Sequence, residues 1–261
     1  MFSIPYFIQT VKSNVKFLFV FTLVLSFFLV VMSYVFTPQA MDSLHSATQG
    51  TVVSNVFSGN GTLIGFMSNS FYALMAIVFP MVYSIMVGNR MIAEKIDKGS
   101  MVGFLSTPTT RTQISVTSAV YFAVSLAVMW GVVSGVGIIA ADAFQPDALD
   151  VDIFLMLNVG ACLYHLVISG ICFCSSCICN SSKNSLTFGA GIPLFFFVVS
   201  MLLKLSGDLD FLKYVTLNTL FDTQGILSGS GYIWKFILMG TTAVILYIVG
   251  IVWFRRKDLP L

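Results

Sequence analysis

Six long apolar runs restrict the fold of this chain more than any other feature. They cover residues 15–36, 71–88, 114–140, 153–178, 186–203 and 233–254. Each run is close to the roughly 17–25 residues that an α-helix needs to cross a bilayer. Inside lipid, only helices and closed barrels satisfy all of their own backbone hydrogen bonds. The runs therefore predict an all-α polytopic membrane protein with six transmembrane helices.

Composition agrees with this class. Hydrophobic residues make up 57% of the chain and charged residues only 9%, whereas a soluble domain carries about 25% charged residues. The six runs and their connections use almost the whole length. We therefore expect one transmembrane domain over residues 1–261 and no separate soluble domain.

The distribution of basic residues predicts the orientation. If the N-terminus lies inside, the inner segments hold ten Lys and Arg residues and the outer segments hold three. Basic residues are in excess on the cytoplasmic side of a membrane protein. We expect a multi-pass protein of the plasma membrane with both termini in the cytoplasm. The net charge of +2 is then the sum of two opposed faces and suggests no nucleic-acid partner.

Three further segments are predicted to lie at the membrane surfaces. Residues 1–14 carry apolar residues at helical spacing and are expected to form a short interfacial helix. These apolar residues are Ile4, Phe7, Ile8 and Val11. Residues 37–70 are rich in Ser, Thr, Asn and Gly and are expected to form an outer loop. Residues 205–232 are too apolar for a free loop and too interrupted for a span, which predicts re-entrant or interfacial helices.

Charge is concentrated in residues 89–111, between the second and third apolar runs. The charged residues there are Arg90, Glu94, Lys95, Asp97, Lys98 and Arg111. A charged segment between two spans must lie in water at a membrane face, so we expect a partner outside the membrane to bind here. The pattern predicts a short helix, a turn at Gly99 and a link through Phe104. Thr107 and Pro108 are expected to start the third span, as its cap and its first residue.

A few polar or special residues lie inside the apolar runs. Pro80 removes a backbone hydrogen bond from the second span, so a neighbouring helix must satisfy the freed carbonyl. His165 lies within the fourth span, where an ionisable residue is a functional candidate. A hydrogen bond between helices and a contact with a transported substrate both remain open for it. Trp130, Tyr164 and His165 are our candidate substrate path.

All five cysteines lie in the fourth run or directly after it, at Cys162, Cys172, Cys174, Cys177 and Cys179. At about 100° per residue, Cys172 and Cys179 share one face of a helix, while Cys174 and Cys177 lie on the other. One helix cannot place all four around a single ion. We therefore expect buried thiols and no metal site.

Several kinds of chemistry have no support in this sequence. It contains no phosphate-binding loop, no H-E-x-x-H and no G-x-S-x-G, so a membrane enzyme is disfavoured. The span centres lack the acidic residue that ion-coupled carriers commonly use, which disfavours an ion-coupled or sodium efflux carrier. A transport function would need its energy from another protein.

The charged stretch resembles the inner loop of permease subunits of type-2 ABC exporters. That loop has a basic residue, a glutamate-led charged helix, a Gly-Ser or Gly-Thr pair and a Leu-Ser-Thr-Pro segment ending near arginine. The matching residues here are Arg90, Glu94, Lys95, Lys98, Gly99, Ser100, Leu105, Ser106, Thr107, Pro108 and Arg111. The closing residues 254–259 also resemble the end of such permeases. The family often has more acidic residues around Glu94, where this chain has Lys95 and Ile96.

The resemblance implies a permease that is not itself an enzyme and holds no cofactor. A second permease, identical or different, would complete the membrane part, and two copies of a separate ATPase subunit would bind ATP and magnesium. Residues 89–98 would form the coupling helix. The implied ATPase-coupling residues are Asn89, Arg90, Glu94, Lys95, Asp97, Lys98, Gly99, Pro108 and Arg111. The 25 phenylalanines suit an amphipathic or hydrophobic substrate such as a peptide or drug. A non-transporting immunity or sensory subunit is the alternative.

Overall fold

The computed structural model describes residues 2–36, 62–105, 109–205 and 216–258. Every regular element in these ranges is a helix, and six helices are long and apolar enough to cross a membrane. The predicted all-α architecture with six spans is therefore confirmed. The spans are α1 (Ile4–Val35), the composite of α4 (Leu63–Ser70), η1 (Phe71–Met75), α5 (Ala76–Met91) and α6 (Ala93–Asp97), then α8 (Arg111–Phe144), α9 (Val151–Ile178), α10 (Ser182–Leu205) and α12 (Ile233–Arg256).

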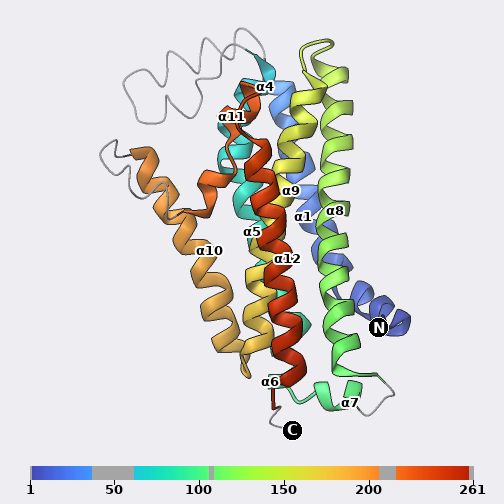
Figure 1. Ribbon diagram of the computed structural model, residues 1–261. Coiled ribbons are helices and arrows are strands. Elements are labelled where there is room, and N and C mark those ends of the chain that lie inside the picture. Colours follow the sequence, from blue (N-terminus) through green and yellow to red (C-terminus); the bar gives the residue numbers. More distant parts are fainter. Residues whose placement is uncertain (1, 37–61, 106–108, 206–215, 259–261) are drawn as a thin grey trace.

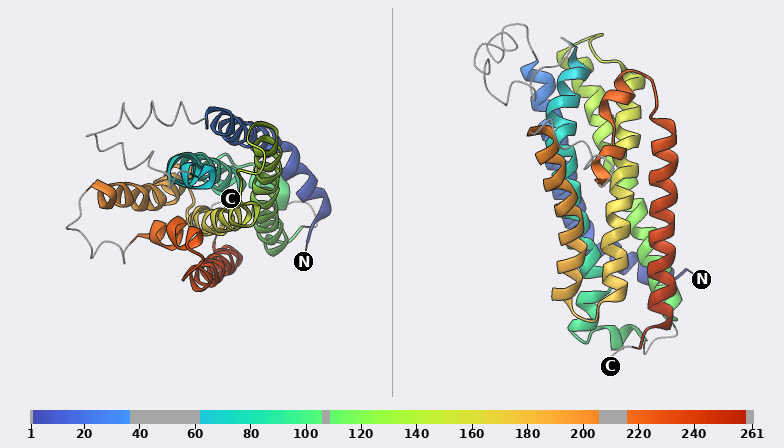
Figure 2. Two further views of the ribbon diagram at one scale, coloured as in Figure 1. Left: turned by 90° about the horizontal axis from the view of Figure 1, so that it is seen from above. Right: turned by 60° about the vertical axis from the view of Figure 1, so that its left-hand side comes forward.

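Helix α9 is the centre of the bundle. It packs against α5, α8, α10 and α12, while α1 packs mainly against α8. The view from above in Figure 2 shows α9, in yellow, surrounded by these helices. Large apolar side chains of α9, among them Phe154, Leu157 and Phe173, are fully buried. Contacts on several sides make α9 the element against which the other spans are positioned.

The outward faces of the bundle are apolar, as lipid requires. Phe19, Phe27 and Ile245 are each more than half exposed. Small hydroxyl residues such as Ser118 and Ser176 are instead completely buried between helices. Small polar residues at helix contacts and apolar residues outside are the arrangement of a membrane bundle.

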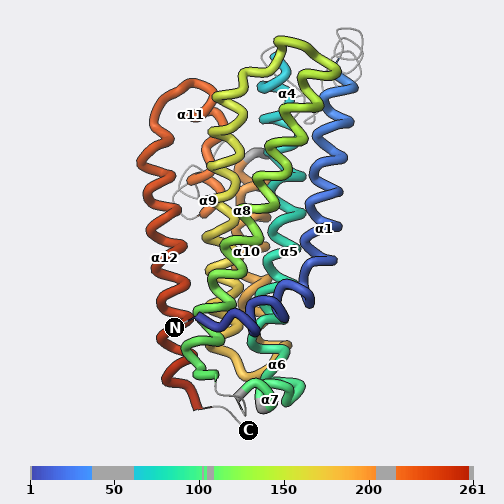
Figure 3. Tube along the Cα trace, turned by 90° about the vertical axis from the view of Figure 1, so that its right-hand side faces the viewer, coloured from blue at the N-terminus to red at the C-terminus, as the bar shows by residue number. Residues whose placement is uncertain are grey.

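The N-terminal segment differs from the predicted separate helix. Helix α1 runs without a break from Ile4 to Val35, although Figure 3 shows that its first turns are inclined to the rest. Tyr6 and Thr10 are buried against the bundle, whereas Ile4 and Ile8 are exposed. Phe7 and Val11 pack partly against the core as well, so one face of these turns contacts protein while Ile4 and Ile8 point outward. This suits the interfacial position that the sequence predicts.

The predicted outer loop over residues 37–70 was wrong at its end. Residues Leu63–Ser70 form α4, and residues 37–61 lie outside the described part of the chain. Thr62 caps α4, because its hydroxyl accepts a hydrogen bond of 3.2 Å from the Gly65 N–H. Phe66 and Met67 are buried in the core. Serine and asparagine suggested a loop here, but a packed membrane bundle accepts such residues inside it.

The predicted start of the third span was also wrong. Helix α8 begins at Arg111, and Thr110 rather than Thr107 is its cap. Thr110 and Gln113 form a reciprocal capping box, with hydrogen bonds of 3.2 and 2.8 Å. This pair satisfies two backbone donors, which a proline at the first position cannot do. Residues 106–108, including Pro108, lie outside the described ranges, and the expected link through Phe104 is a short helix, α7 (Met101–Leu105).

The segment before the last span reaches into the bundle. Its described part contains η3 (Leu217–Leu220) and α11 (Thr223–Leu227), and Figure 1 shows η3 deeper than α11. The Tyr164 hydroxyl donates a hydrogen bond to Asn218, whose side-chain amide donates to the Ser200 hydroxyl at 2.6 Å. Tyr164 lies about 20 Å along α9 from the start of that helix. The segment thus enters the bundle beside α9, and we keep the predicted name, re-entrant segment, as a label for residues 216–232. Residues 206–215 lie outside the description.

Candidate functional site: the charged connection and the second span at Pro80

The charged stretch is not one helix. Helix α5 ends at Met91, Ile92 breaks the helix with φ −130° and ψ −61°, and α6 follows. Gly99 then turns the chain into α7 with φ +69°, a backbone conformation that favours glycine. Figure 1 shows α6 and α7 at the same end of the bundle as the N-terminal turns of α1 and the end of α12. The predicted coupling helix over 89–98 is therefore two helices that meet at a break.

The exposed part of this connection is small. Asp97, Lys98, Gly99 and Ser100 are exposed, whereas Ile92, Ala93 and Ile96 are buried. We refer to these four exposed residues, 97–100, as the tip. Within residues 89–100 it is the part that is open to contact by another protein, and Gly103 and Thr110 are exposed farther along the stretch.

Lys95 fastens the tip to the N-terminal turns of α1. Its ammonium donates a hydrogen bond of 2.9 Å to the Tyr6 hydroxyl. It also lies 4.6 Å from the centre of the Tyr6 ring and 5.0 Å from that of Phe104. The Tyr6 hydroxyl is in turn 3.3 Å from the Ser118 hydroxyl on α8. Cation–π contacts contribute about 0.5–2 kcal/mol, more when water is excluded. One side chain thus links α6 to α1, α7 and α8.

Glu94 lies between two basic residues. Its carboxylate is 2.5 Å from the Lys98 ammonium and 3.8 Å from the Arg90 guanidinium, so the predicted i,i+4 pairing with Lys98 is present. The Arg90 guanidinium also lies 4.7 Å from the Phe17 ring centre on α1. Exposed i,i+4 pairs contribute only about 0.3–0.5 kcal/mol each. These contacts orient the charged side chains more than they stabilise the fold.

Polar contacts hold the break at Ile92 to α9 and α10. The Ala93 N–H donates to the Ser176 hydroxyl of α9 at 2.9 Å. This satisfies one of the donors that the start of a helix leaves unpaired. The Asn89 amide donates to the Ser182 hydroxyl, at the first residue of α10, at 2.7 Å. The predicted site residue Asn89 is thus a buried link between spans.

Arg111 belongs to a second set of links at the same end of the bundle. Its guanidinium donates to the Lys257 carbonyl at 2.6 Å. The Lys257 ammonium donates to the carbonyls of Cys177 and Cys179, at 3.1 and 2.6 Å, and burial lowers its pKa. The start of α8, the end of α12 and the end of α9 are joined in this way. The sequence indicated Lys257 only as a marker of orientation, since nothing in the pattern shows that it returns to α9.

The carbonyl that Pro80 frees in the second span has a specific partner. Pro80 has no N–H, so the Ala76 carbonyl four residues earlier lacks its helical donor. The His165 Nε2 lies 2.7 Å from that carbonyl oxygen and donates to it. The π-helical turn η1 directly precedes Ala76. Two irregularities thus lie within a few residues of each other, and a histidine from α9 satisfies the freed carbonyl.

The candidate substrate-path residues lie together in the protein core. Trp130 and His165 stack with ring centres 5.8 Å apart, and Tyr164 meets His165 edge-on at 5.1 Å. Their exposed fractions are 2%, 1% and 0% for Trp130, Tyr164 and His165. Of the two open interpretations of His165, the structure shows the hydrogen bond between helices. Contact with a substrate stays a prediction.

A polar chamber of about 420 Å³ lies toward the other end of the bundle. The composite second span contributes Asn69 and Tyr72 to its lining, and α10 contributes Ser200. The re-entrant segment contributes Asn218 and Gln224, so the chamber adjoins Tyr164 through Asn218. Sequence reasoning did not identify this chamber, because its lining comes from segments that lie far apart in the chain.

An ion pair fixes the re-entrant segment beside this chamber. The Lys235 ammonium is 2.6 Å from the Asp222 carboxylate, and the same carboxylate caps α11 through the Gly225 N–H at 2.9 Å. Partial burial alone would raise the pKa of Asp222, but these hydrogen bonds outweigh burial and hold the pKa below its usual value.

The cysteines form no ligand set in the part of the chain that the structure describes. No group of three or more His, Cys, Asp or Glu side chains is placed there to hold a metal ion. Cys172 and Cys177 are buried, and Cys172 donates to the Gly189 carbonyl at 3.2 Å.

Six spans, a charged tip at one end and a polar chamber toward the other define a polytopic membrane protein. Comparison with known families matches residues 7–259 to the family described as "ABC-2 family transporter protein". The chain belongs to this family. It is therefore a multi-pass permease component rather than the ATPase, and such permeases typically dimerise and work with a separate ATPase subunit. No similar protein was found among curated sequences.

Proposed function

We propose that this chain is the permease of an ATP-driven exporter in the plasma membrane, with both termini in the cytoplasm. Two permease subunits, identical or different, would assemble with two copies of an ATPase subunit that binds ATP and magnesium. The observation that carries this proposal is the tip at residues 97–100, which is exposed while the residues around it are fastened to four spans. A rigidly held exposed tip suits the transmission of force from a docked partner.

The links define how a movement of the tip would spread. Lys95 would transmit this movement to α1 and, through Tyr6, to α8. Asn89 would transmit it to α10, and the Ala93 N–H would transmit it to α9. A push on the tip would then move the ends of these spans together as a rigid body. The π-helical turn η1 and Pro80 lie farther from the tip in the second span. Bending at these two irregularities would let the opposite half of the span respond separately.

The chamber supports an amphipathic substrate, such as a peptide or drug. Polar groups on Asn69, Ser200 and Asn218 share the chamber with apolar side chains, including Ile77 and Leu203. Ligand sites commonly combine a mainly apolar lining with a few placed polar groups. Its position, at the end away from the tip, suits the outward part of an export route.

The test compares two matched charge changes at opposite ends of the bundle. The tagged chain with Lys98→Glu, which changes the tip, is purified from its native membrane beside Asp147→Lys, which changes the far end. We expect Lys98→Glu to lose co-purified ATPase and ATP-driven transport in vesicles, and Asp147→Lys to keep both. Loss of a charged docking contact costs about 2–5 kcal/mol when its partner charge stays buried. Full association and transport with Lys98→Glu would refute docking at the tip, and full association without any transport would favour the sensory or immunity role.

A further inference from the structure

The basic end of α12 carries a groove that the proposed function does not use. The groove measures about 500 Å³, and none of its lining residues belongs to the chamber or the tip. Its lining is Ile248, Val249, Val252, Trp253, Arg256 and Lys257. These residues form two rows with a spacing of four, and side chains four apart lie above one another on a helix. One row is Ile248, Val252 and Arg256, and the other is Val249, Trp253 and Lys257. In each row, two apolar or aromatic residues are followed by a basic residue.

The two exposed tryptophans of α12 mark the depth of this groove in the membrane. Trp234 and Trp253 are 56% and 52% exposed, and a helix places residues 19 apart about 28 Å from each other. That distance matches a hydrocarbon core about 30 Å thick, and tryptophan is enriched at both interfaces. Val249 and Val252 then lie at the level of acyl chains, and Arg256 lies at the level of lipid headgroups.

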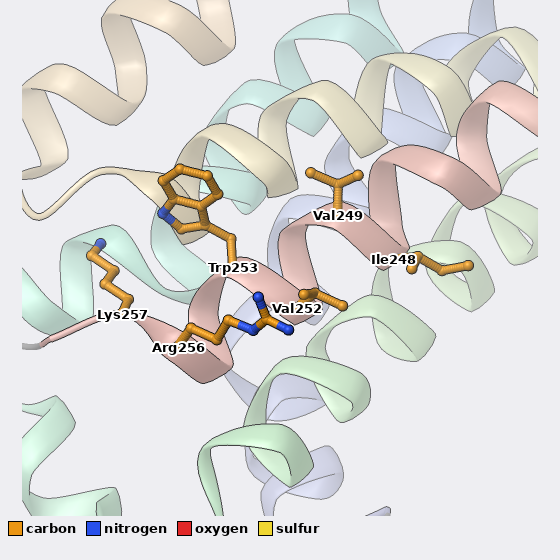
Figure 4. A pocket seen from close by; sticks show the side chains of 6 residues that line it. All are labelled: Ile248, Val249, Val252, Trp253, Arg256 and Lys257. Atoms are coloured by element: carbon orange, nitrogen blue, oxygen red, sulfur yellow. The ribbon is translucent and has the colours of Figure 1, made fainter.

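Arg256 is the free cation of the groove. It is exposed, and within the described residues it makes no hydrogen bond or ion pair, whereas Lys257 is engaged by carbonyls of α9. Figure 4 shows the Arg256 guanidinium extending along the helix beside Val252, while Trp253 and Lys257 point to the other side. A guanidinium can bind two phosphate oxygens at once.

We infer that this groove is a binding site for an anionic phospholipid. One acyl chain lies along Val249 and Val252, and the headgroup phosphate binds Arg256. Charge complementarity favours a lipid that carries a net negative charge, because the adjacent Arg255 and Lys257 add to the same positive potential. A zwitterionic lipid brings its own ammonium into this potential and loses part of the attraction.

A second copy of the chain is a poorer occupant of the same groove. Two permeases related by a two-fold axis along the membrane normal would meet here through the same residues. Each Arg256 would then face its counterpart at the same depth, and Arg255 would add to the repulsion. Like charges in such a contact disfavour association.

The test needs neither ATP nor an ATPase, so its outcome is independent of the proposed transport function. The delipidated chain in detergent is titrated with phosphatidylglycerol, or with phosphatidylcholine of the same acyl chains, and bound lipid is counted by native mass spectrometry. We expect tighter binding of phosphatidylglycerol. Its affinity should fall by about tenfold or more for Arg256→Gln, because this change removes a charge-assisted contact with the phosphate as well as one charge near the surface, whereas Arg255→Gln removes only the charge.

Arg255→Gln is the matched control, because Arg255 is exposed at the same helix end but does not line the groove. Val252→Trp tests the apolar part, since it fills the groove without changing charge, and it should also weaken binding. Equal affinity for the two lipids would overturn the inference, as would equal losses for Arg255→Gln and Arg256→Gln. Efficient disulfide formation between two copies carrying Val252→Cys, in a chain without native cysteines, would assign the groove to a permease partner instead.

Discussion

Replacement of His165 by Phe should leave the Ala76 carbonyl without any donor. Pro80 cannot supply one, and the His165 Nε2 is the group that now lies 2.7 Å from that oxygen. Phe keeps an aromatic ring of similar size, so the stacking on Trp130 and the packing volume should change little. The variant therefore isolates the hydrogen bond from the surrounding aromatic contacts.

The expected loss of stability follows from the surroundings of this bond. His165 is completely buried, so water does not replace the lost donor. An unsatisfied buried polar group costs about 1–3 kcal/mol, while hydrogen bonds between helices in a membrane average about 0.6 and reach about 1.7 kcal/mol. We expect His165→Phe to lower the free energy of unfolding by about 1–2 kcal/mol.

Pro80→Ala is the second substitution of a double-mutant cycle, and it tests whether His165 acts through the freed Ala76 carbonyl. Alanine restores an N–H at position 80, and the Ala76 carbonyl can then accept the ordinary helical hydrogen bond. In that background His165→Phe should cost little, so the double-mutant cycle should show a coupling of about 1 kcal/mol.

The measurement is unfolding in mixed micelles with increasing dodecyl sulfate, followed by tryptophan fluorescence, for the four proteins of the cycle. A cost of His165→Phe that is the same with and without the Pro80→Ala change would show that the histidine does not act through the freed carbonyl. In that case the histidine would be better explained by packing, or by the substrate contact that the sequence left open.

Three further results are expected. Lys95→Met should release the first turns of α1, seen as faster proteolysis near Tyr6, and should reduce transport far more than stability, whereas a variant that only unfolds would lose both together. Lys257→Met should lower the free energy of unfolding by about 1–3 kcal/mol, because two carbonyls at the end of α9 lose a charged donor, and an unchanged unfolding midpoint would count against the link. Because the pKa of Asp222 is lowered in the folded state, its stabilising effect is complete above the ordinary carboxyl pKa of about 3.9 and is lost as pH falls through the lower folded value. Protection of residues 216–232 from hydrogen exchange, relative to the intrinsic exchange rate at each pH, should therefore be constant from pH 7 to about 5. It should fall only in stronger acid, a response that Asp222→Asn should remove.

The spans could be predicted from the sequence because lipid imposes one simple requirement on each of them. A run of apolar residues long enough to cross the bilayer is forced into a helix, and the spans cover all six runs to within about one residue. The errors lie at span ends, where this requirement no longer applies. The α4 residues contain serine and asparagine, and only their burial beside Phe66 and Met67 shows that they continue the second span. Thr110 and Gln113 have the spacing of a capping box in the sequence. The prediction used Thr107 and Pro108 instead, because proline is common at the first position of a helix.

The chemistry of the charged connection could be predicted, but its geometry could not. Charge pattern predicts that residues 89–111 lie in water, and the exposed tip agrees with this, although Asn89, Ile92 and Ile96 are buried. Spacing along one helix predicts the pairing of Glu94 with Lys98. Nothing in the local pattern shows that Lys95 turns toward Tyr6 or that Asn89 binds Ser182, since these partners are 89 and 93 residues away. The sequence predicts that polar and charged residues near a membrane face contact a partner protein. In the structure, however, Asn89, Lys95 and Arg111 contact their own chain. Their role in coupling would therefore be to stiffen the support of the tip, and the contact itself would fall to the residues at 97–100.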